Sequence, residues 1–224
     1  MDWPQLGIVI PTYNRRETLR NTIHATQNHL YYQSRYRFFI ADDGSDDGTQ
    51  DMLRDEFPHV ALVQSLREGL GANTNRGLQS AFQYSDYILQ FQDDMQMLVT
   101  IDLHPHVELL MNEQTCGFVR LWGVGGHKYE GALEGNYWRV YWHSPDLFIP
   151  SDRPHVKHKR FHDHFGYYPE GRKTADTEQA WCHQCKDVAG KNGVRLDVFV
   201  PQNQLTESTW EHVEWGNRWR DKGL

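Results

Sequence analysis

An adjacent pair of acidic residues, Asp93-Asp94, follows directly on an apolar segment in the middle of the chain. Residues 87–91 are apolar enough to form a buried strand, and Gln92 leads from them into the pair. Charges at the end of a buried strand cost free energy unless they meet water, a cation or hydrogen-bond donors. Two neighbouring carboxylates are also the hard oxygen ligands that Mg²⁺ and Mn²⁺ prefer. The pair is therefore a candidate metal site, with a solvated turn after a strand as the plain alternative.

A divalent ion held there would have a definite chemical use. It could bridge two oxygens of a diphosphate and offset the negative charge that develops as the diphosphate leaves. A second acidic segment, Asp-Asp-Gly-Ser-Asp-Asp-Gly-Thr at residues 42–49, follows another apolar run. A turn and a helix N-cap explain part of it, because Asp, Ser and Thr favour both. The carboxylates exceed what capping needs, and Asp42 or Asp43 could accept a hydrogen bond from a nucleobase.

The segments around these residues alternate between short apolar runs and stretches with helical spacing. The expected strands are residues 6–10, 36–41, 60–63 and 87–91, and the expected helices are residues 17–30, 49–57 and 73–84. This alternation predicts an α/β fold with a mostly parallel central sheet and helices on both faces. Ligands bind beyond the carboxyl ends of such strands. Polar segments follow three of the strands, so we expect these segments to meet at one edge of the sheet.

Beyond residue 100 the pattern is weaker. We expect strands within residues 116–124, 137–142 and 196–200, a loop over 155–168 and a helix over 177–188. The 224 residues are enough for one well-buried domain and too few for two of ordinary size. The 8 Trp, 11 Tyr and 10 Phe supply large areas for burial, so we expect the whole chain to fold as a single domain.

Charge and composition exclude several classes of protein. The 30 acidic residues outnumber the 23 basic ones, and the net charge of −7 argues against nucleic-acid binding, which needs a basic face. No run of about 18 apolar residues predicts a transmembrane segment, and the first residues lack the pattern of a signal peptide. The 3 cysteines fit a reducing compartment. We expect a cytoplasmic protein, either free or peripheral to the membrane.

Four segments together are specific where each alone is not. They are Val-Ile-Pro-Thr-Tyr-Asn-Arg at 9–15, Ala-Asp-Asp-Gly-Ser-Asp-Asp-Gly-Thr at 41–49, Gly-Leu-Gly-Ala-Asn-Thr-Asn-Arg-Gly at 69–77 and Phe-Gln-Asp-Asp at 91–94. Their order and spacing, over about the first hundred residues, resemble the family 2 glycosyltransferases of the GT-A fold, which is Rossmann-like. The resemblance implies a nucleotide-binding half over residues 1–98 and an acceptor-binding half over residues 99–224.

The resemblance also implies roles for particular residues. The base and ribose of a nucleotide-sugar donor would lie against Pro11, Thr12, Tyr13 and Arg15. Asp42 or Asp43 would bond the base, Asp93 would contact the donor, and Asp94 would bind Mn²⁺ or Mg²⁺ directly. Many GT-A enzymes take a later His as a further metal ligand, and His212 lies in the corresponding region.

The third segment departs from the family pattern. Thr74 stands where the family often has Arg, which leaves Asn75 and Arg76 as the candidates for contacts with the donor. A second departure lies at residues 174–181, which resemble the Glu-Asp motif of the family with Ala175 in place of the first acid.

Asp176 matches the second acid of that motif, at the start of the helix expected over residues 177–188. The field of a helix N-terminus keeps a carboxylate ionised, which suits a general base on an acceptor hydroxyl. Asp176 is the first candidate for this catalytic role and Glu178 the second. A helix cap by Asp176, with Glu178 complementing the helix dipole, would explain both residues without catalysis. If either is the base, a single displacement inverts the anomeric centre.

Other residues carry weaker signals. Cys182 and Cys185 form a CxxC that could bind zinc with His162 or His164, although one helical turn of a core explains it equally well. His155 and His158 belong to the expected loop and could contact an acceptor, or lie on the surface. An aromatic tail, Trp210, Trp215 and Trp219, could stack on a sugar or pack onto the domain or a partner subunit, and a homodimer is compatible with it.

Together these features predict a metal-dependent, inverting glycosyltransferase of hexosyltransferase type. Its donor would be a nucleotide-diphosphate sugar, UDP-sugar first on family frequency, and its acceptor a hydroxyl of a saccharide, a lipid-linked sugar or another molecule. A non-catalytic nucleotide-sugar or glycan-binding module is the rival that Ala175 and Thr74 favour. A nucleotidyltransferase is a third hypothesis, but that class opens with a Gly-rich basic loop where this chain has Pro-Thr-Tyr-Asn-Arg.

Overall fold

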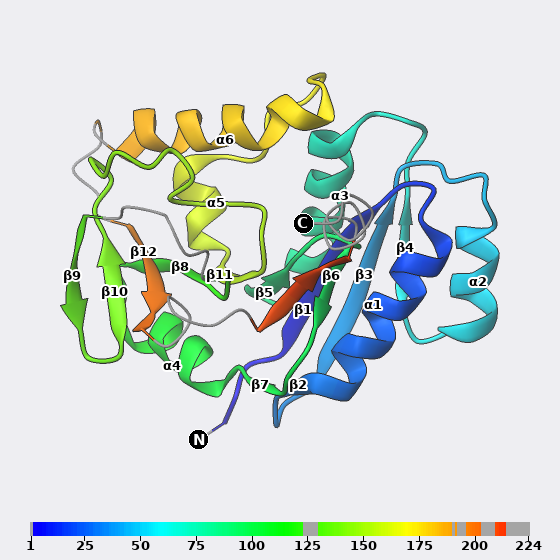
Figure 1. The fold of residues 1–224 in the computed structure, drawn as a ribbon, viewed down its shortest axis with the longest axis horizontal. Coiled ribbons are helices and arrows are strands. Elements are labelled where there is room, and N and C mark those ends of the chain that lie inside the picture. The colour runs from blue at the N-terminus through cyan, green and yellow to red at the C-terminus, as the bar shows by residue number, and fades with distance from the viewer. Residues whose placement is uncertain (1, 123–129, 190, 192–195, 203–208, 214–224) are drawn as a thin grey trace, which may run out of the picture.

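The computed structural model describes residues 2–122, 130–189, 191, 196–202 and 209–213 (Figure 1). They form one nine-stranded sheet with the order β4-β3-β1-β5-β11-β8-β12-β10-β9, and two small two-stranded sheets. Helices cover both faces of the large sheet, so the predicted α/β fold, with its central sheet between helices, is confirmed.

The first half of the sheet is parallel. Strand β1 (Leu6–Thr12) lies at its centre and pairs with β3 (Tyr36–Asp42) on one side and β5 (Tyr87–Gln90) on the other, while β4 (Ala61–Gln64) extends the sheet beyond β3. The connections run through α1 (Arg16–His29), α2 (Thr49–Glu56) and α3 (Leu70–Phe82). All seven residues of β1 are buried, which is why its sequence reads as a continuous apolar run.

The second half of the sheet is mixed. Its strands are β8 (Cys116–Arg120), β9 (Gly131–Glu134), β10 (Tyr137–Val140), β11 (His155–His158) and β12 (Asp197–Pro201). Strand β11 runs antiparallel between β5 and β8, whereas β12 is parallel to β8. The helices of this half are α4 (His104–Asn112), α5 (Arg160–Phe165) and α6 (Thr174–Ala189).

Two further pairs of strands form small sheets of their own. Strand β2 (Leu30–Tyr31) pairs with β7 (Ile101–Asp102), and β6 (Met95–Met97) pairs with β13 (Trp210–His212). The second pair matters for the site, because it brings His212 opposite Met95, the residue that follows Asp94.

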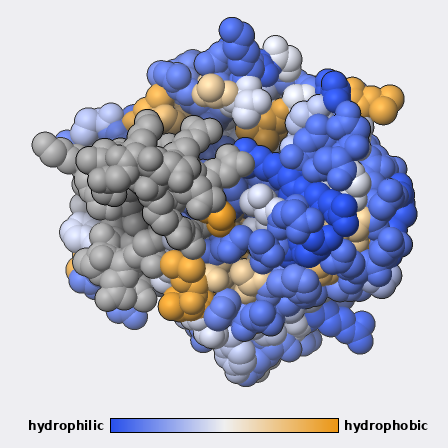
Figure 2. Space-filling model, turned by 45° about the vertical axis from the view of Figure 1, so that its right-hand side comes forward, coloured by the Kyte–Doolittle hydropathy of each residue, from blue (hydrophilic) through white to orange (hydrophobic). Residues whose placement is uncertain are grey.

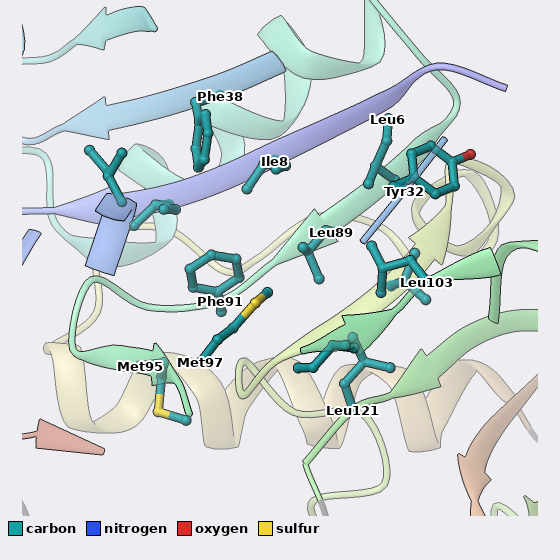
Figure 3. Close-up of a cluster of buried hydrophobic side chains, with 14 of the residues drawn as sticks. Leu6, Ile8, Tyr32, Phe38, Leu89, Phe91, Met95, Met97, Leu103 and Leu121 are labelled. Carbon is teal, nitrogen blue, oxygen red and sulfur yellow. The ribbon is translucent and has the colours of Figure 1, made fainter. Parts of the chain in front are cut away.

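Alternate residues of β1 enter two separate cores, since successive side chains of a strand point to opposite faces. Leu6 and Ile8 belong to the core under α1, α2 and α4, part of which is drawn in Figure 3. Val9 belongs to the core under α3, α5 and α6. A fully buried Phe or Leu in either core contributes about 1.5–3 kcal/mol through the apolar area removed from water. The two cores hold the sheet rigid from both sides.

The expectation of a loop over residues 155–168 is wrong. This segment forms β11 and α5, and both His155 and Lys157 are fully buried in the middle of the sheet. The Lys157 Nζ donates to Gln90 Oε1 at 2.6 Å, the His155 Nδ1–H donates to the Arg153 carbonyl oxygen at 2.6 Å, and the ring of His155 stacks on Phe118. Because charged and polar residues lower the local hydropathy, the pattern of this segment does not indicate a buried strand. The histidines therefore do not form a surface loop.

Burial also decides between a zinc site and a place in the core for the CxxC of α6. Cys182 and Cys185 are both buried, and the Cys182 thiol donates to the carbonyl oxygen of Pro150 at 3.0 Å. Burial raises the pKa of both thiols, which disfavours the thiolate that zinc binds. In the described ranges no group of three or more His, Cys, Asp or Glu side chains is arranged as a metal site. The pair is a turn of helix in the core. 

The remaining differences concern the ends of elements and the weakly patterned half. Helix α3 begins at Leu70, three residues before the predicted start, after Gly69 in a left-handed conformation (φ 88°). Helix α4 and strand β9 were not predicted. Trp210 is buried, whereas Trp215 and Trp219 lie outside the described residues. Among the helices of the described part, none is long and apolar enough to cross a membrane.

Candidate active site

Three polar segments meet at the carboxyl ends of β1, β3 and β5, as the alternation of strands and helices predicts. They enclose a cleft of about 230 Å³. Its lining residues are Pro11, Thr12, Tyr13, Arg15, Asp43, Gly69, Leu70, Asn73, Gln92, Asp93 and Thr174. Six of the residues predicted to bind the donor, Pro11, Thr12, Tyr13, Arg15, Asp43 and Asp93, therefore lie together. Hydrophilic side chains predominate on the face drawn in Figure 2.

Asp93 and Asp94 are held by hydrogen bonds from β1 and from the residues that follow it. The Thr12 hydroxyl donates to Asp93 Oδ2 at 2.7 Å, and the Thr22 hydroxyl donates to the Asp93 carbonyl oxygen at 2.6 Å. Arg15 Nη1 lies 2.9 Å from Asp93 Oδ1 and 2.7 Å from Asp94 Oδ2. One guanidinium group thus bridges both carboxylates.

This arrangement shifts the ionisation of Asp93, which is 4% exposed. Burial raises the pKa of Asp93 to about 7, and the neighbouring charge of Asp94 acts in the same direction. Arg15 and the Thr12 hydroxyl oppose this shift. A cation close to Asp93 would favour the charged form of this carboxylate.

Asp94 offers a metal ion a buried oxygen. Its Oδ1 has no hydrogen-bond partner among the residues that the structure describes, while His212 Nε2 lies 3.6 Å from its Oδ2. An unpartnered carboxylate oxygen in a buried position costs free energy, and a cation would remove that cost. Mg²⁺ and Mn²⁺ sites in enzymes commonly use one or two carboxylates and complete the shell with water and substrate phosphates. Asp94 and Asp93 therefore supply the one or two carboxylates that such a site needs.

Asp43 and Asp42 differ in what they face. Asp43 lines the cleft and accepts hydrogen bonds from the backbone N–H of Glu68 at 2.8 Å and of Gly69 at 2.9 Å. Asp42 is fully buried and accepts from the backbone N–H of Ser45 and from Gln50 Nε2. Asp42 is not among the lining residues of the cleft. Of the two candidates for contact with a base, the geometry favours Asp43.

Asn75 and Arg76 also lie away from the cleft. The Asn75 side chain bonds the backbone of Tyr168 through both its oxygen and its nitrogen, at 3.0 and 2.9 Å. Arg76 forms an ion pair with Glu68. Asn73, one turn of helix earlier, lines the cleft instead and donates to the Ala41 carbonyl oxygen at 2.7 Å. Asn73 was not among the predicted site residues, although its place in the first turn of the helix after Gly69 was a usable signal.

The two candidates for the general base occupy different surfaces of α6. Asp176 is exposed and lines an outer groove. Glu178 is partly buried and lines a cavity of about 190 Å³. The other lining residues of this cavity, which we name the acceptor-side cavity, are Gln92, Met95, Asp152, Arg153 and His212. Glu178 therefore opens onto the same space as the metal-ligand candidate His212 and the residue before Asp93.

Asp152 is a residue of this cavity that sequence analysis missed. Its backbone N–H donates to Glu178 Oε1 at 3.1 Å, and the Ser151 hydroxyl donates to the same oxygen at 2.6 Å. Asp152 lies in an irregular segment before β11, in a region without a motif, so no local pattern could have selected it. Only the fold brings it to the end of β5.

Comparison with known proteins agrees with the geometry. Residues 7–168 match the family model described as "Glycosyl transferase family 2". Glycosyltransferase AglE of Haloferax volcanii is 28% identical over 139 residues, which are 60% of this chain and 41% of that protein. A Campylobacter jejuni protein, GalNAc(5)-diNAcBac-PP-undecaprenol beta-1,3-glucosyltransferase, is 27% identical over 139 residues, or 60% of this chain and 42% of that protein. The chain spans about two fifths of the length of these relatives.

Solved structures share the fold. S. aureus TarS, solved with UDP-GlcNAc, has a TM-score of 0.65 at 15% identity, covering 94% of this chain and 60% of that one. GalNAc-T7, solved with UDP, GalNAc and Mn²⁺, has a TM-score of 0.65 at 13% identity, covering 90% of this chain and 43% of that one. These likenesses establish the GT-A fold, and the family match, which ends at residue 168, includes strands of both halves of the sheet. The chain therefore belongs to glycosyl transferase family 2.

Proposed function

We propose that the protein is a metal-dependent, inverting glycosyltransferase that takes a sugar from a nucleoside-diphosphate sugar, UDP-sugar first. The observation that carries the proposal is the unpartnered, buried Oδ1 of Asp94, beside a cleft that Asp43 and Asp93 line. A carboxylate oxygen in that condition is suited to a cation, and a cation there is suited to a diphosphate.

Residues of the cleft would hold the donor. Tyr13 is 39% exposed, and the guanidinium carbon of Arg67 lies 5.2 Å from the centre of its ring. The ring face and Asp43 are the groups suited to a nucleobase, one by stacking and the other by accepting a hydrogen bond. Arg15 supplies positive charge where the diphosphate would lie. A bound Mn²⁺ or Mg²⁺, held by Asp94 with Asp93 and His212 nearby, would stabilise the charge on the leaving diphosphate.

Glu178 is the general base that the geometry supports. Its carboxylate lies in the acceptor-side cavity with Gln92 and His212, whereas Asp176 faces the outer groove. The acceptor hydroxyl would give its proton to Glu178 while its oxygen forms a bond to C1 of the sugar. The bond from C1 to the diphosphate oxygen breaks in the same step, and the electron pair leaves with the diphosphate. Attack from the side opposite to the leaving group inverts the anomeric centre.

The relatives support this choice of substrates. TarS is solved with UDP-GlcNAc, and GalNAc-T7 is solved with UDP and Mn²⁺, in the same fold as this chain. The name of the C. jejuni relative includes an undecaprenol-linked saccharide. We therefore propose a saccharide hydroxyl, free or lipid-linked, as the acceptor, and a protein that works at or near a membrane surface.

Calorimetric titration tests the donor site. UDP, GDP and dTDP are titrated into the protein with Mn²⁺, with Mg²⁺ and with EDTA. We expect UDP to bind with a metal present and to bind at least tenfold more weakly in EDTA. Asp94→Asn should lose this metal dependence, whereas the matched surface variant Asp55→Asn should keep it. Absence of binding by every nucleotide in Mn²⁺ refutes the proposal, and binding without any donor turnover would favour a non-catalytic nucleotide-sugar module.

A further inference from the structure

A short chain of hydrogen bonds links the metal motif to Glu178. Gln92, which directly precedes Asp93, donates from its Nε2 to Asp152 Oδ2. The backbone N–H of Asp152 and the hydroxyl of Ser151 both donate to Oε1 of Glu178, at 3.1 and 2.6 Å. The end of β5 thus fixes Asp152, and the segment containing Asp152 fixes the carboxylate on α6.

The carboxyl groups of Asp152 and Glu178, which belong to this series of hydrogen bonds, also interact directly. Burial raises the pKa of Asp152 well above its ordinary value, and the charge of Glu178 and a hydrogen bond with Glu178 act in the same direction. Arg153 and the amide of Gln92 oppose the shift only in part. Two neighbouring carboxyl groups in such a position share one proton. Burial and the neighbouring carboxyl group thus favour the neutral form of Asp152.

The other polar groups near Asp152 and Glu178 do not replace the link that Asp152 makes between Gln92 and Glu178. Tyr168 is buried, and its hydroxyl accepts a hydrogen bond from Gln90 Nε2 at 3.0 Å. The Cys182 thiol donates to Pro150. Arg153 lies over the ring of Trp122, with its guanidinium carbon 5.3 Å from the ring centre. Asp152 is thus the residue that joins Gln92 to Glu178.

We propose that Asp152 is the positioning residue for Glu178, holding the base carboxylate at a fixed place relative to the metal motif through Gln92. The inference rests on the proposed function for its catalytic consequence. It predicts that the side chain of Asp152 contributes to the rate of transfer without touching the donor. A base displaced by about 1 Å loses much of its effect on the rate.

Crystal structures of the wild type, Asp152→Ala and Asp152→Asn test the positional part without any substrate. We expect Glu178 to leave the Ser151 hydroxyl in Asp152→Ala, because Gln92 no longer holds the segment of residues 151–153. Asp152→Asn keeps an acceptor for Gln92 and a donor for Glu178, so Glu178 should stay in place. An unmoved Glu178 in Asp152→Ala overturns the proposal, whatever the enzyme's substrates are.

Kinetics test the catalytic part, with UDP-GlcNAc and water as the acceptor and Mn²⁺ present. We expect Asp152→Ala to lower kcat for UDP release at least tenfold with an unchanged donor KM, and Asp152→Asn to restore most of the rate. The pH–rate profile of Asp152→Asn should differ in shape from the wild type, because one carboxyl of the pair is gone. Asp187→Asn, a matched change on the exposed side of α6, should match the wild type in kcat, in donor KM and in the pH–rate profile.

The outcomes separate the two proposals. If the wild type releases UDP and Asp152→Ala has an unchanged kcat, the positioning role is overturned while the proposed function stands. If the wild type neither binds UDP nor releases it, the proposed function fails, and the crystal structures alone decide whether Asp152 fixes Glu178. A raised donor KM in Asp152→Ala would also overturn the inference, because it would place Asp152 in donor binding. Circular dichroism of each variant confirms that it is folded.

Discussion

Arg15 Nη1 lies 2.7 Å from Asp94 Oδ2, although 79 positions separate the two residues in the chain. The same nitrogen lies 2.9 Å from Asp93 Oδ1. Arg15 follows β1 and the acidic pair follows β5, so the parallel pairing of these two strands produces the contact. The guanidinium group neutralises part of the charge that a metal ion would otherwise balance.

Replacement of Arg15 by Met should therefore destabilise the metal-free protein and increase its response to Mn²⁺. The variant leaves two buried carboxylates without their cation, and a cost of about 1–3 kcal/mol is expected because Arg15 is itself partly exposed to solvent. Thermal unfolding with EDTA and with Mn²⁺ measures both effects. A variant as stable as the wild type in EDTA would show that the ion pair contributes nothing. Arg54→Met, which breaks a surface ion pair with Asp51, is the control.

Asp93 should make stability depend on pH. Its pKa is about 7 in the folded protein and has its ordinary value of 3.8 in the unfolded chain. Between these values the folded state binds more protons, so stability falls as pH rises from about 4 to 7, and the penalty is constant above that range. The loss is on the order of a few kcal/mol. Urea unfolding at pH 5 and pH 8 should show a smaller difference in Asp93→Asn than in the wild type, and equal differences would count against the shift.

Glu178→Gln and Asp176→Asn decide between the two candidate bases. We expect Glu178→Gln to lower the rate of transfer by about 10²–10⁴, the usual contribution of a general base, with UDP binding unchanged. Asp176→Asn should stay within about threefold of the wild-type rate, since that side chain faces the outer groove. Single-turnover release of UDP in the presence of Mn²⁺ measures both. The reverse result would return the role to Asp176 and remove the basis for Glu178 as the base.

The parallel first half of the sheet could be predicted from the sequence because its signals are local. Each strand of residues 6–10, 36–41 and 87–91 is a buried apolar run, and a polar segment follows at the end where ligands bind. The parallel arrangement then brings Thr12, Asp43 and Asp93 to one cleft, although their separation in the chain is large. The regular alternation of parallel strands and helices therefore indicates which of these residues lie together.

The second half could not be predicted in the same way, because its polar residues are buried by long-range contacts. The amine of Lys157 is satisfied by Gln90, 67 residues earlier, and Asp152 is positioned by Gln92, 60 residues earlier. Nothing in the local sequence indicates such partners. Asn75 and Asn73 show the same limit in the first half of the chain. Their side chains lie on different sides of α3, and of the two Asn73 lines the cleft whereas Asn75 bonds the backbone of Tyr168.

Lys157, in the buried sheet behind the site, should also make stability depend on pH. Its amine is fully buried, bonds Gln90 Oε1 at 2.6 Å and lies 5.7 and 5.8 Å from the centres of the Trp181 and Tyr168 rings. Burial lowers the pKa of Lys157 well below its ordinary value of 10.5. In the window between the lowered pKa and 10.5, the unfolded chain binds more protons, so this residue makes stability rise with pH.

Lys157→Met should remove that rise, because Met fills a similar volume and carries no titrating group. The expected result is a smaller gain in the free energy of unfolding between pH 7 and pH 9 than the wild type shows, measured by urea unfolding. The Lys159→Met variant is the matched control, since Lys159 pairs with Asp163 on the surface and is outside the sheet. Equal gains in the wild type and in Lys157→Met would mean that the buried amine keeps its proton when the protein folds.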